Sequence, residues 1–120
     1  MLDPEALLKL SYGMCIATSF KDDNYNGCLV NTVFQVAPEP PRIAVSINNQ
    51  ALTCEYIKES RVFAISILAE SAPMNYMGRF GFRSGRDFNK FKETRFRTAK
   101  TGAPILTYQA VGYMEAELFD

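Results

Sequence analysis

The stretch from Gly27 to Pro41 constrains the fold of this chain most, because it combines a strand-like pattern with an abrupt end. Its even positions are mostly apolar, while Asn31 and Gln35 place two amides four residues apart at odd positions. Side chains alternate between the two faces of a strand, so both amides would share one face, opposite Phe34. Three prolines close the stretch, and proline cannot donate to a central sheet ladder. The pattern predicts one long strand that ends at these prolines.

Composition is typical of an ordinary soluble globule. The chain has 120 residues, of which 48% are hydrophobic, with 13 basic and 13 acidic side chains. We therefore expect a single domain, residues 1–120. No apolar run approaches the ~18 residues of a membrane helix, and the N-terminus lacks an export signal. We expect a cytoplasmic protein with no membrane partner.

The titratable residues exclude several kinds of chemistry. The chain has no histidine, so common catalytic triads and most zinc or non-haem iron sites lack their usual base or ligand. Its three widely spaced cysteines form no C-x-x-C motif, which indicates a reducing compartment and thiols that belong to the core. We expect no metal site and no catalytic side chain. The chemistry would then belong to a bound cofactor.

The remaining segments predict mostly short strands with two or three small helices. Asn26-Gly27 is a strong turn pair, which would join a first strand to an antiparallel neighbour. Gly112 would form a bulge in the last strand. Such a pattern indicates a barrel-like β fold rather than βαβ repeats. We expect strands at 14–18, from 27 to the prolines, 42–48, 62–68 and 108–119, and helices at 3–10, from 52 onward and 73–80.

The motif residues of the opening stretch resemble the flavin reductase family. Gly27, Asn31, Thr32, Val36 and the acid-Pro-Pro end fit its register, and the match continues through I-A-V-S-I-N, L-T, I-K-E-S, V-F-A-I-S-I-L, S-G-R-D and K-F. The resemblance implies a mainly β, Greek-key-like, FMN-binding split β-barrel, as in flavoredoxin and rubredoxin-associated flavin reductase domains. It also implies a homodimer with the flavin at the subunit interface. The family's usual C-terminal strand segment, G-x-H-x-x-x-x-G-x-V, is absent before the chain stops.

Nine residues are candidates for the flavin site. Backbone groups beside small residues could bind the edge of the flavin ring, and a helix N-terminus with a hydroxyl suits a phosphate. The alternatives are that Thr53 merely caps its helix and that Asn31 faces solvent or a turn. The ring of Phe34 is expected in the core. The resemblance assigns the ring edge to Asn31, Thr32, Val33 and Phe34, the ribityl-phosphate side to Ser46, Ile47, Asn48 and Thr53, and a positive charge to Lys90.

By resemblance, the reaction is hydride transfer from NAD(P)H to flavin, followed by electron release to an acceptor such as rubredoxin or an oxygenase. Hydride transfer needs stacked geometry and hydrogen-bond donors rather than a protein base, which suits a chain without histidine. The alternative within the same fold is an FMN-binding electron-transfer protein that NAD(P)H cannot reduce by itself.

Residues 79–100 carry eight basic and two acidic side chains, with five phenylalanines among them. We interpret most of these charges as a solvated surface whose phenylalanines pack inward, although a nucleotide-phosphate face is the functional alternative. Arg79-Phe80-Gly81-Phe82 also matches part of an aromatic RNA-stacking motif. Arg83 stands where that motif needs an aliphatic residue. An RNA-binding domain is therefore a remote alternative, and we expect no nucleic-acid partner.

Overall fold

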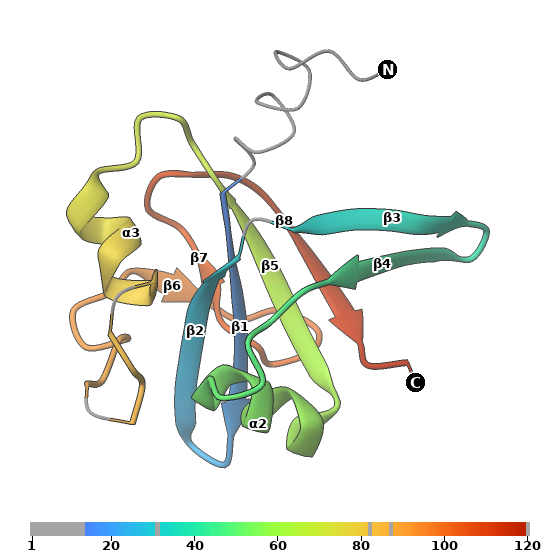
Figure 1. The fold of residues 1–120 in the computed structure, drawn as a ribbon, viewed down its shortest axis with the longest axis horizontal. Helices are drawn as coiled ribbons and strands as arrows, with labels where there is room; N and C mark the ends of the chain where they lie inside the picture. Colours follow the sequence, from blue (N-terminus) through green and yellow to red (C-terminus); the bar gives the residue numbers. More distant parts are fainter. Residues whose placement is uncertain (1–13, 31, 82, 87, 120) are drawn as a thin grey trace.

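A computed structural model describes residues 14–30, 32–81, 83–86 and 88–119 of the chain (Figure 1). A four-stranded antiparallel sheet in the order β2-β1-β5-β8 forms the centre of the molecule. Two further pairs, β3-β4 and β6-β7, lie outside this sheet. The described part is therefore mainly β with two helices, as the sequence predicts. Its elements are β1 (Cys15–Lys21), β2 (Asn24–Val30), β3 (Val33–Pro38), β4 (Pro41–Val45), α2 (Leu52–Ser60), β5 (Val62–Leu68), α3 (Met74–Gly81), β6 (Phe96–Arg97), β7 (Ile105–Leu106) and β8 (Ala110–Glu117).

The central sheet is covered on both faces, so most residues of its middle strands, β1 and β5, are buried. Ile16 of β1 packs in one cluster with Phe80 of α3, while Ala17, the next residue, packs in another with Ile57 of α2. Figure 1 shows α2 and α3 at different sides of the sheet. Alternation along β1 therefore supplies two cores, because successive side chains enter opposite faces. No helix among the described residues is both long and apolar enough to cross a membrane.

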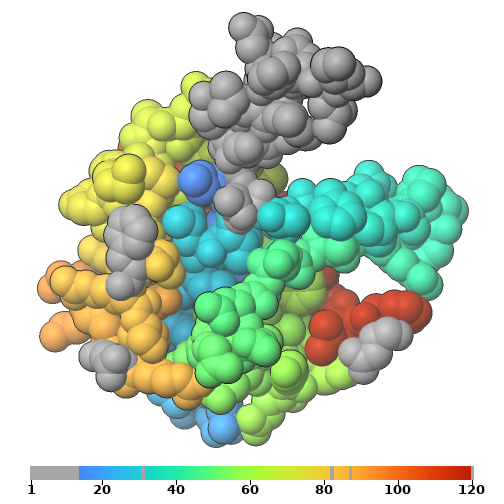
Figure 2. Space-filling model, in the orientation of Figure 1, coloured from blue at the N-terminus to red at the C-terminus, as the bar shows by residue number. Residues whose placement is uncertain are grey.

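The β3-β4 hairpin projects from the body of the molecule as an arm (Figures 1 and 2). The prediction of one long strand is therefore wrong: β2 ends at Val30, and β3 begins at Val33 in a separate sheet. Val30 pairs with Cys15, the first residue of β1, so the partner strand ends at this point. No other described segment continues the ladder beyond Val30, and from Val33 the chain pairs with β4 instead.

The turn before β2 also differs from the prediction. It lies at Asp22-Asp23, with Asp22 at φ 56°, and Asn26 and Gly27 are already inside the strand. A Cβ atom on Gly27 would lie 3.0 Å from the Cγ2 atom of Thr18. The glycine therefore permits close approach between neighbouring strands rather than a turn.

Several other elements match their predicted positions. The strand at 62–68 and the helices beginning near 52 and 74 are confirmed, as is the antiparallel β1-β2 pair. The register between β5 and β8 shifts beside Gly112, which confirms the bulge. The predicted strand at 42–48 ends earlier, at Val45, and the two-residue strands β6 and β7 were not expected. The helix predicted at 3–10 lies outside the described residues.

The basic segment behaves largely as a surface over a phenylalanine core. Phe80 and Phe91 are buried, and the Arg83 guanidinium carbon lies 4.5 Å from the centroid of the Phe88 ring. Phe80 belongs to a helix and is only 1% exposed, so it cannot stack on an RNA base. Phe82, the other aromatic residue of the motif, lies outside the described residues. The burial of Phe80 therefore argues against the RNA-binding alternative.

Candidate functional site

The two predicted flavin-lining segments meet where the hairpin leaves the sheet. The Ser46 N–H donates to the Thr32 carbonyl oxygen at 3.1 Å, just beyond the register pair Val33–Val45. Thr32 and Ser46 are exposed at this junction. Asn31, assigned to the same site, lies outside the described residues. The tertiary structure thus brings the two segments together, while their binding of a flavin stays a prediction.

The segment after β4 leads directly into α2. The Asn48 side-chain oxygen accepts the Gln50 N–H at 2.9 Å, and the Asn48 carbonyl accepts the Ala51 N–H at 3.0 Å. Ala51 is the N-cap residue of α2 and provides no side-chain acceptor for the first turn. The first N–H groups of a helix have no partner within the helix, and its dipole places positive charge there. This end of α2 is therefore suited to bind an anion.

Thr53 lies in that first turn but does not cap the helix, so the capping alternative is wrong. The residue is fully buried between α2 and the sheet. Its hydroxyl lies beside the Cys28 thiol, a weak acceptor, and has no hydrogen bond of ordinary geometry in the described part of the chain. Buried hydroxyls normally have a strong partner, so this one marks a place where a polar ligand group would fit.

Lys90 is also near the Cys28 thiol. Its ammonium is buried and donates to the carbonyl oxygens of Gly27, at 2.8 Å, and Phe80, at 3.0 Å. Burial lowers the pKa of Lys90, and this is opposed by the nearby Cys28. Burial raises the pKa of Cys28, which the Thr53 hydroxyl and the Lys90 ammonium partly oppose. Lys90 therefore joins β2 to the end of α3 and adds buried positive charge near the start of α2.

Cys28, which the sequence analysis assigns to the core, is close to two candidate site residues. Its thiol faces Thr53 and Lys90, which are 25 and 62 positions away in the sequence. Only the packing of α2 and the 88–94 segment against β2 reveals this proximity. The one sequence signal was the alternation along β2, which assigns Cys28 to one face without saying what covers it.

An apolar groove runs between the hairpin arm and the end of β8 (Figure 2). Its volume is about 1770 Å³, and its lining includes the predicted site residues Val33, Phe34 and Ile47. Phe34 is 55% exposed, so the prediction that its ring packs in the core is wrong. Within the part of the chain that the structure describes, the hairpin pairs with itself alone and no second layer covers this side chain. The Arg42 guanidinium lies 4.2 Å from the centre of the Phe119 ring across the groove.

The arrangement has the parts that a flavin mononucleotide requires. An open helix N-terminus and an unpartnered buried hydroxyl suit the phosphate end, and exposed backbone at the hairpin junction suits the polar edge of a ring. An apolar groove begins at the same junction and suits the ring faces. The residues present therefore fit the cofactor.

Comparisons with known proteins agree with this site. Residues 7–120 match the family model described as flavin reductase like domain. The high molecular weight rubredoxin of Moorella thermoacetica is 44% identical over 117 residues, which cover 98% of this chain and 51% of that protein. The ferric-chelate reductase (NAD(P)H) of Archaeoglobus fulgidus is 42% identical over 117 residues, covering 98% of this chain and 69% of that protein.

The fold has a solved counterpart. The crystal structure of an FMN-binding protein from Thermus thermophilus superposes with a TM-score of 0.82 at 23% identity, over 90% of this chain and 60% of that one. With its mainly β architecture, the molecule has the split-barrel fold of that protein. The chain belongs to the flavin reductase like domain family. It spans about half the length of the first relative named here.

Proposed function

We propose that the chain binds FMN non-covalently and supports NAD(P)H-dependent reduction of the flavin, with electrons passing on to an acceptor. The observation that carries this proposal is the uncapped first turn of α2, with the buried, unpartnered Thr53 hydroxyl inside it. Bound flavin would supply the hydride-accepting and electron-releasing chemistry. The protein would bind and orient it and keep water away from the ring.

The hydrogen bonds already present limit what each residue can offer. The Ser46 N–H is used by Thr32, so Ser46 would contribute its hydroxyl. The Asn48 side-chain oxygen is used by Gln50, so Asn48 would contribute its amide NH₂. Thr53 would contribute its hydroxyl and the adjacent helix N–H groups. These donors all suit a phosphate or ribityl oxygen.

The ring edge would meet the backbone at the hairpin junction. Thr32, Val33 and Phe34 are described there, and the sequence also assigns Asn31 to this edge. Ile47 lines the groove and would pack against the ring. Lys90 uses two of the three ammonium donors on carbonyl oxygens, so its contribution would be positive charge near the flavin together with one remaining donor.

A second copy of the chain would complete the site. The groove exceeds the roughly 300–1,000 Å³ of an ordinary ligand pocket, and its wall carries exposed Phe34 and Val36. We propose a homodimer in which the partner covers this arm and closes the flavin site at the subunit interface. The acceptor would be rubredoxin, a ferric complex or an oxygenase, and the free thiols fit a cytoplasmic location.

The test is a titration of the purified protein with FMN, followed by anaerobic mixing with NADH or NADPH. We expect a yellow complex whose visible absorbance bleaches on mixing. Binding without bleaching would favour the electron-transfer alternative. A folded protein that stays colourless in excess FMN, with no gain in Tm, would contradict the proposal.

A pair of substitutions at Thr53 tests the phosphate seat, which is the phosphate-binding site proposed at the first turn of α2 and the Thr53 hydroxyl. Thr53→Val keeps the size of the side chain but removes the hydroxyl, so we expect FMN affinity to fall about tenfold. The same change should stabilise the cofactor-free protein, because it removes a buried group without a partner. Thr53→Ser keeps the hydroxyl and is the matched control, with FMN affinity close to that of the natural sequence. Equal FMN affinity in all three proteins would contradict this assignment.

A further inference from the structure

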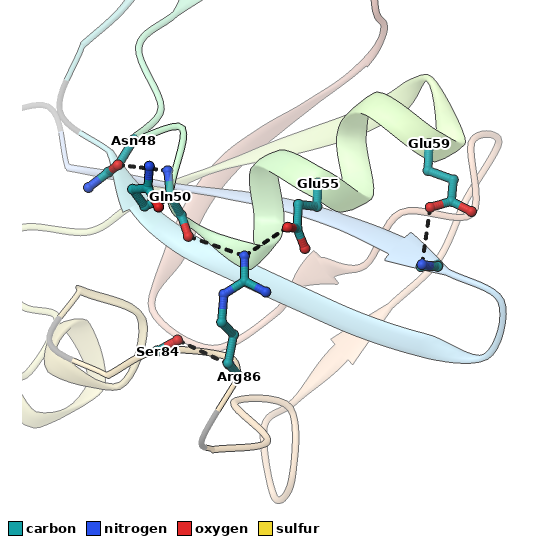
Figure 3. A network of polar contacts seen from close by, with 7 residues as sticks. Asn48, Gln50, Glu55, Glu59, Ser84 and Arg86 are labelled. Carbon is teal, nitrogen blue, oxygen red and sulfur yellow. Dashed lines mark hydrogen bonds and ion pairs between the residues drawn. The ribbon is translucent and has the colours of Figure 1, made fainter.

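A polar network joins the start of α2 to a distant turn of the chain (Figure 3). Arg86 donates from Nη2 to the Glu55 carboxylate at 2.9 Å and to the Gln50 carbonyl at 3.4 Å. Gln50 precedes the helix, and Glu55 lies in its first turn. One guanidinium therefore bridges the segment before the helix and the helix itself, at the end where the phosphate seat is proposed.

The turn that carries Arg86 is anchored to the sheet. A Cβ atom on Gly85 would clash with the side-chain oxygen of Asn26, a residue that is itself 2% exposed in β2. The turn can approach β2 this closely only because position 85 has no side chain. The Arg86 N–H also donates to the Ser84 hydroxyl at 3.1 Å. The guanidinium thus faces α2 from a turn that lies against β2 at Gly85 and has one hydrogen bond within it.

Glu55 creates an electrostatic problem for a phosphate at this end of α2. A carboxylate in the first turn favours the helix dipole but repels an incoming dianion. The hydrogen bond from Arg86 holds the pKa of Glu55 below its ordinary value, so the carboxylate is charged at neutral pH. Without a nearby cation, this charge would offset part of the attraction from the helix N-terminus.

We infer that Arg86 is a positioning residue for the phosphorylated end of the flavin. It neutralises Glu55 and ties that residue to the Gln50 carbonyl, which keeps the segment before α2 in place and its N–H groups available. The consequence is selectivity for a phosphorylated flavin over riboflavin, which has the same ring but no phosphate. This inference rests on the proposed FMN-binding function and assigns a role within it.

The same helix offers a matched control at its other end. Lys21 and Glu59 form an ion pair at 3.2 Å, with side chains 46% and 60% exposed. The corresponding values for Arg86 and Glu55 are 46% and 56%. Figure 3 shows Glu55 and Glu59 on α2, with Arg86 beside Glu55 and Glu59 farther along the helix. The two ion pairs have similar exposure, but only Arg86 also bonds the segment before α2, so a general loss of surface charge can be separated from a local effect.

The experiment measures dissociation constants for FMN and for riboflavin by quenching of flavin fluorescence. In Arg86→Ala we expect FMN binding to weaken about tenfold and riboflavin binding to change less than about twofold. Lys21→Ala should leave both constants within about twofold of the natural protein. Equal weakening of both flavins in Arg86→Ala would indicate a merely structural role and overturn the inference, as would unchanged FMN binding.

A double variant tests the charge argument directly. Arg86→Ala combined with Glu55→Gln removes the repelling carboxylate as well as its counterion, so most of the lost FMN affinity should return. No recovery would overturn the role assigned to Glu55 neutralisation. The natural protein itself decides the underlying proposal: failure to bind either flavin overturns FMN binding, whereas normal FMN binding with an indifferent Arg86→Ala overturns this inference alone.

Discussion

The central strand β5 and the hairpin strand β3 contain the same Val-Phe pair at their start but lie in opposite environments. Phe63, in β5, is 5% exposed, whereas Phe34, in β3, is 55% exposed. β5 lies in the central sheet, where Phe63 packs in one cluster with Ile57 of α2, while among the described residues β3 pairs with β4 alone. Burial therefore depends on what packs over the face of the strand and not on the residue pattern. The exposed arm lines the groove of the candidate site, as expected of an apolar surface kept for binding.

The largest effect on stability should come from a substitution in the buried strand β5. Phe63→Ala removes a ring from the cluster beneath α2, and we expect the free energy of unfolding to fall by about 3–5 kcal/mol. Urea denaturation monitored by circular dichroism measures this change. A loss below about 1 kcal/mol would mean that the sheet relaxes around the cavity and that β5 is less tightly packed than its burial indicates.

A smaller effect is expected from the buried ammonium that ties β2 to α3. Lys90→Met keeps the apolar stem but leaves the Gly27 and Phe80 carbonyls without this donor, at a cost of about 1–3 kcal/mol. Burial lowers the pKa of Lys90, so the folded state releases this proton before the unfolded state does. The stability of the natural protein relative to Lys90→Met should therefore rise as pH increases toward the ordinary lysine pKa of about 10.4.

The control for this change is the exposed Lys100, whose substitution by methionine should alter neither stability nor its pH dependence. Thermal unfolding between pH 7 and pH 10 distinguishes the two variants. Identical profiles for Lys90→Met and Lys100→Met would contradict the role given to the buried ammonium.

A substitution in the edge strand β8 should have a weaker effect on stability. The Glu115 carboxylate accepts hydrogen bonds from the Thr101 N–H at 3.0 Å and the Thr101 hydroxyl at 2.7 Å, and its pKa is lowered mainly by the backbone donor of Thr101. Its stabilising contribution is present above the ordinary glutamate pKa of about 4.3 and is lost as pH falls through the lowered value. Glu115→Gln should reduce Tm by roughly 2 °C at pH 7, with the difference shrinking in acid. A difference that grows below pH 4 would contradict this assignment.

The exposed half of the comparison should show the smallest effect on folding. Phe34→Ser removes a ring that contacts little in the single chain, so the free energy of unfolding should change by less than about 0.5 kcal/mol. If a second copy covers the arm, the same change should raise the dimer dissociation constant at least about tenfold. Analytical ultracentrifugation measures the association. Destabilisation comparable to Phe63→Ala would erase the distinction between the two regions.

Local patterns predicted those elements whose causes lie between near neighbours in the sequence. The run at 62–68, apolar except for Ser66, is a strand buried on both faces, and Pro73 precedes the helix α3 as expected. The alternation through 27–38 does correspond to strand structure, but it belongs to two strands, β2 and β3, rather than to one. The break after Val30 depends on where β1 begins, which no pattern within β2 and β3 reveals.

The candidate site also has one part that the sequence predicted and another that only the structure showed. The residue types and spacing at 46–53 predicted a polar segment leading into a helix N-terminus, and the resemblance joined it to 31–34. The structure supplied the contact between Thr32 and Ser46, the missing cap at Ala51 and the orphan hydroxyl of Thr53. Sequence reasoning also left Arg86 among surface charges. Its pairing with Glu55 requires the turn at Gly85 to lie against β2.

The sequence by itself determined the mainly β character, the positions of α2, α3 and β5, and the family to which the chain belongs. These features follow from apolar alternation, helix start signals and motif residues. Each of these signals involves residues that are close together in the sequence. The tertiary structure alone decided that Phe34 is exposed, that Lys90 is buried against two carbonyls and that Arg86 faces the start of α2. Each depends on which distant segment lies alongside, because burial and charge pairing are properties of neighbours in space.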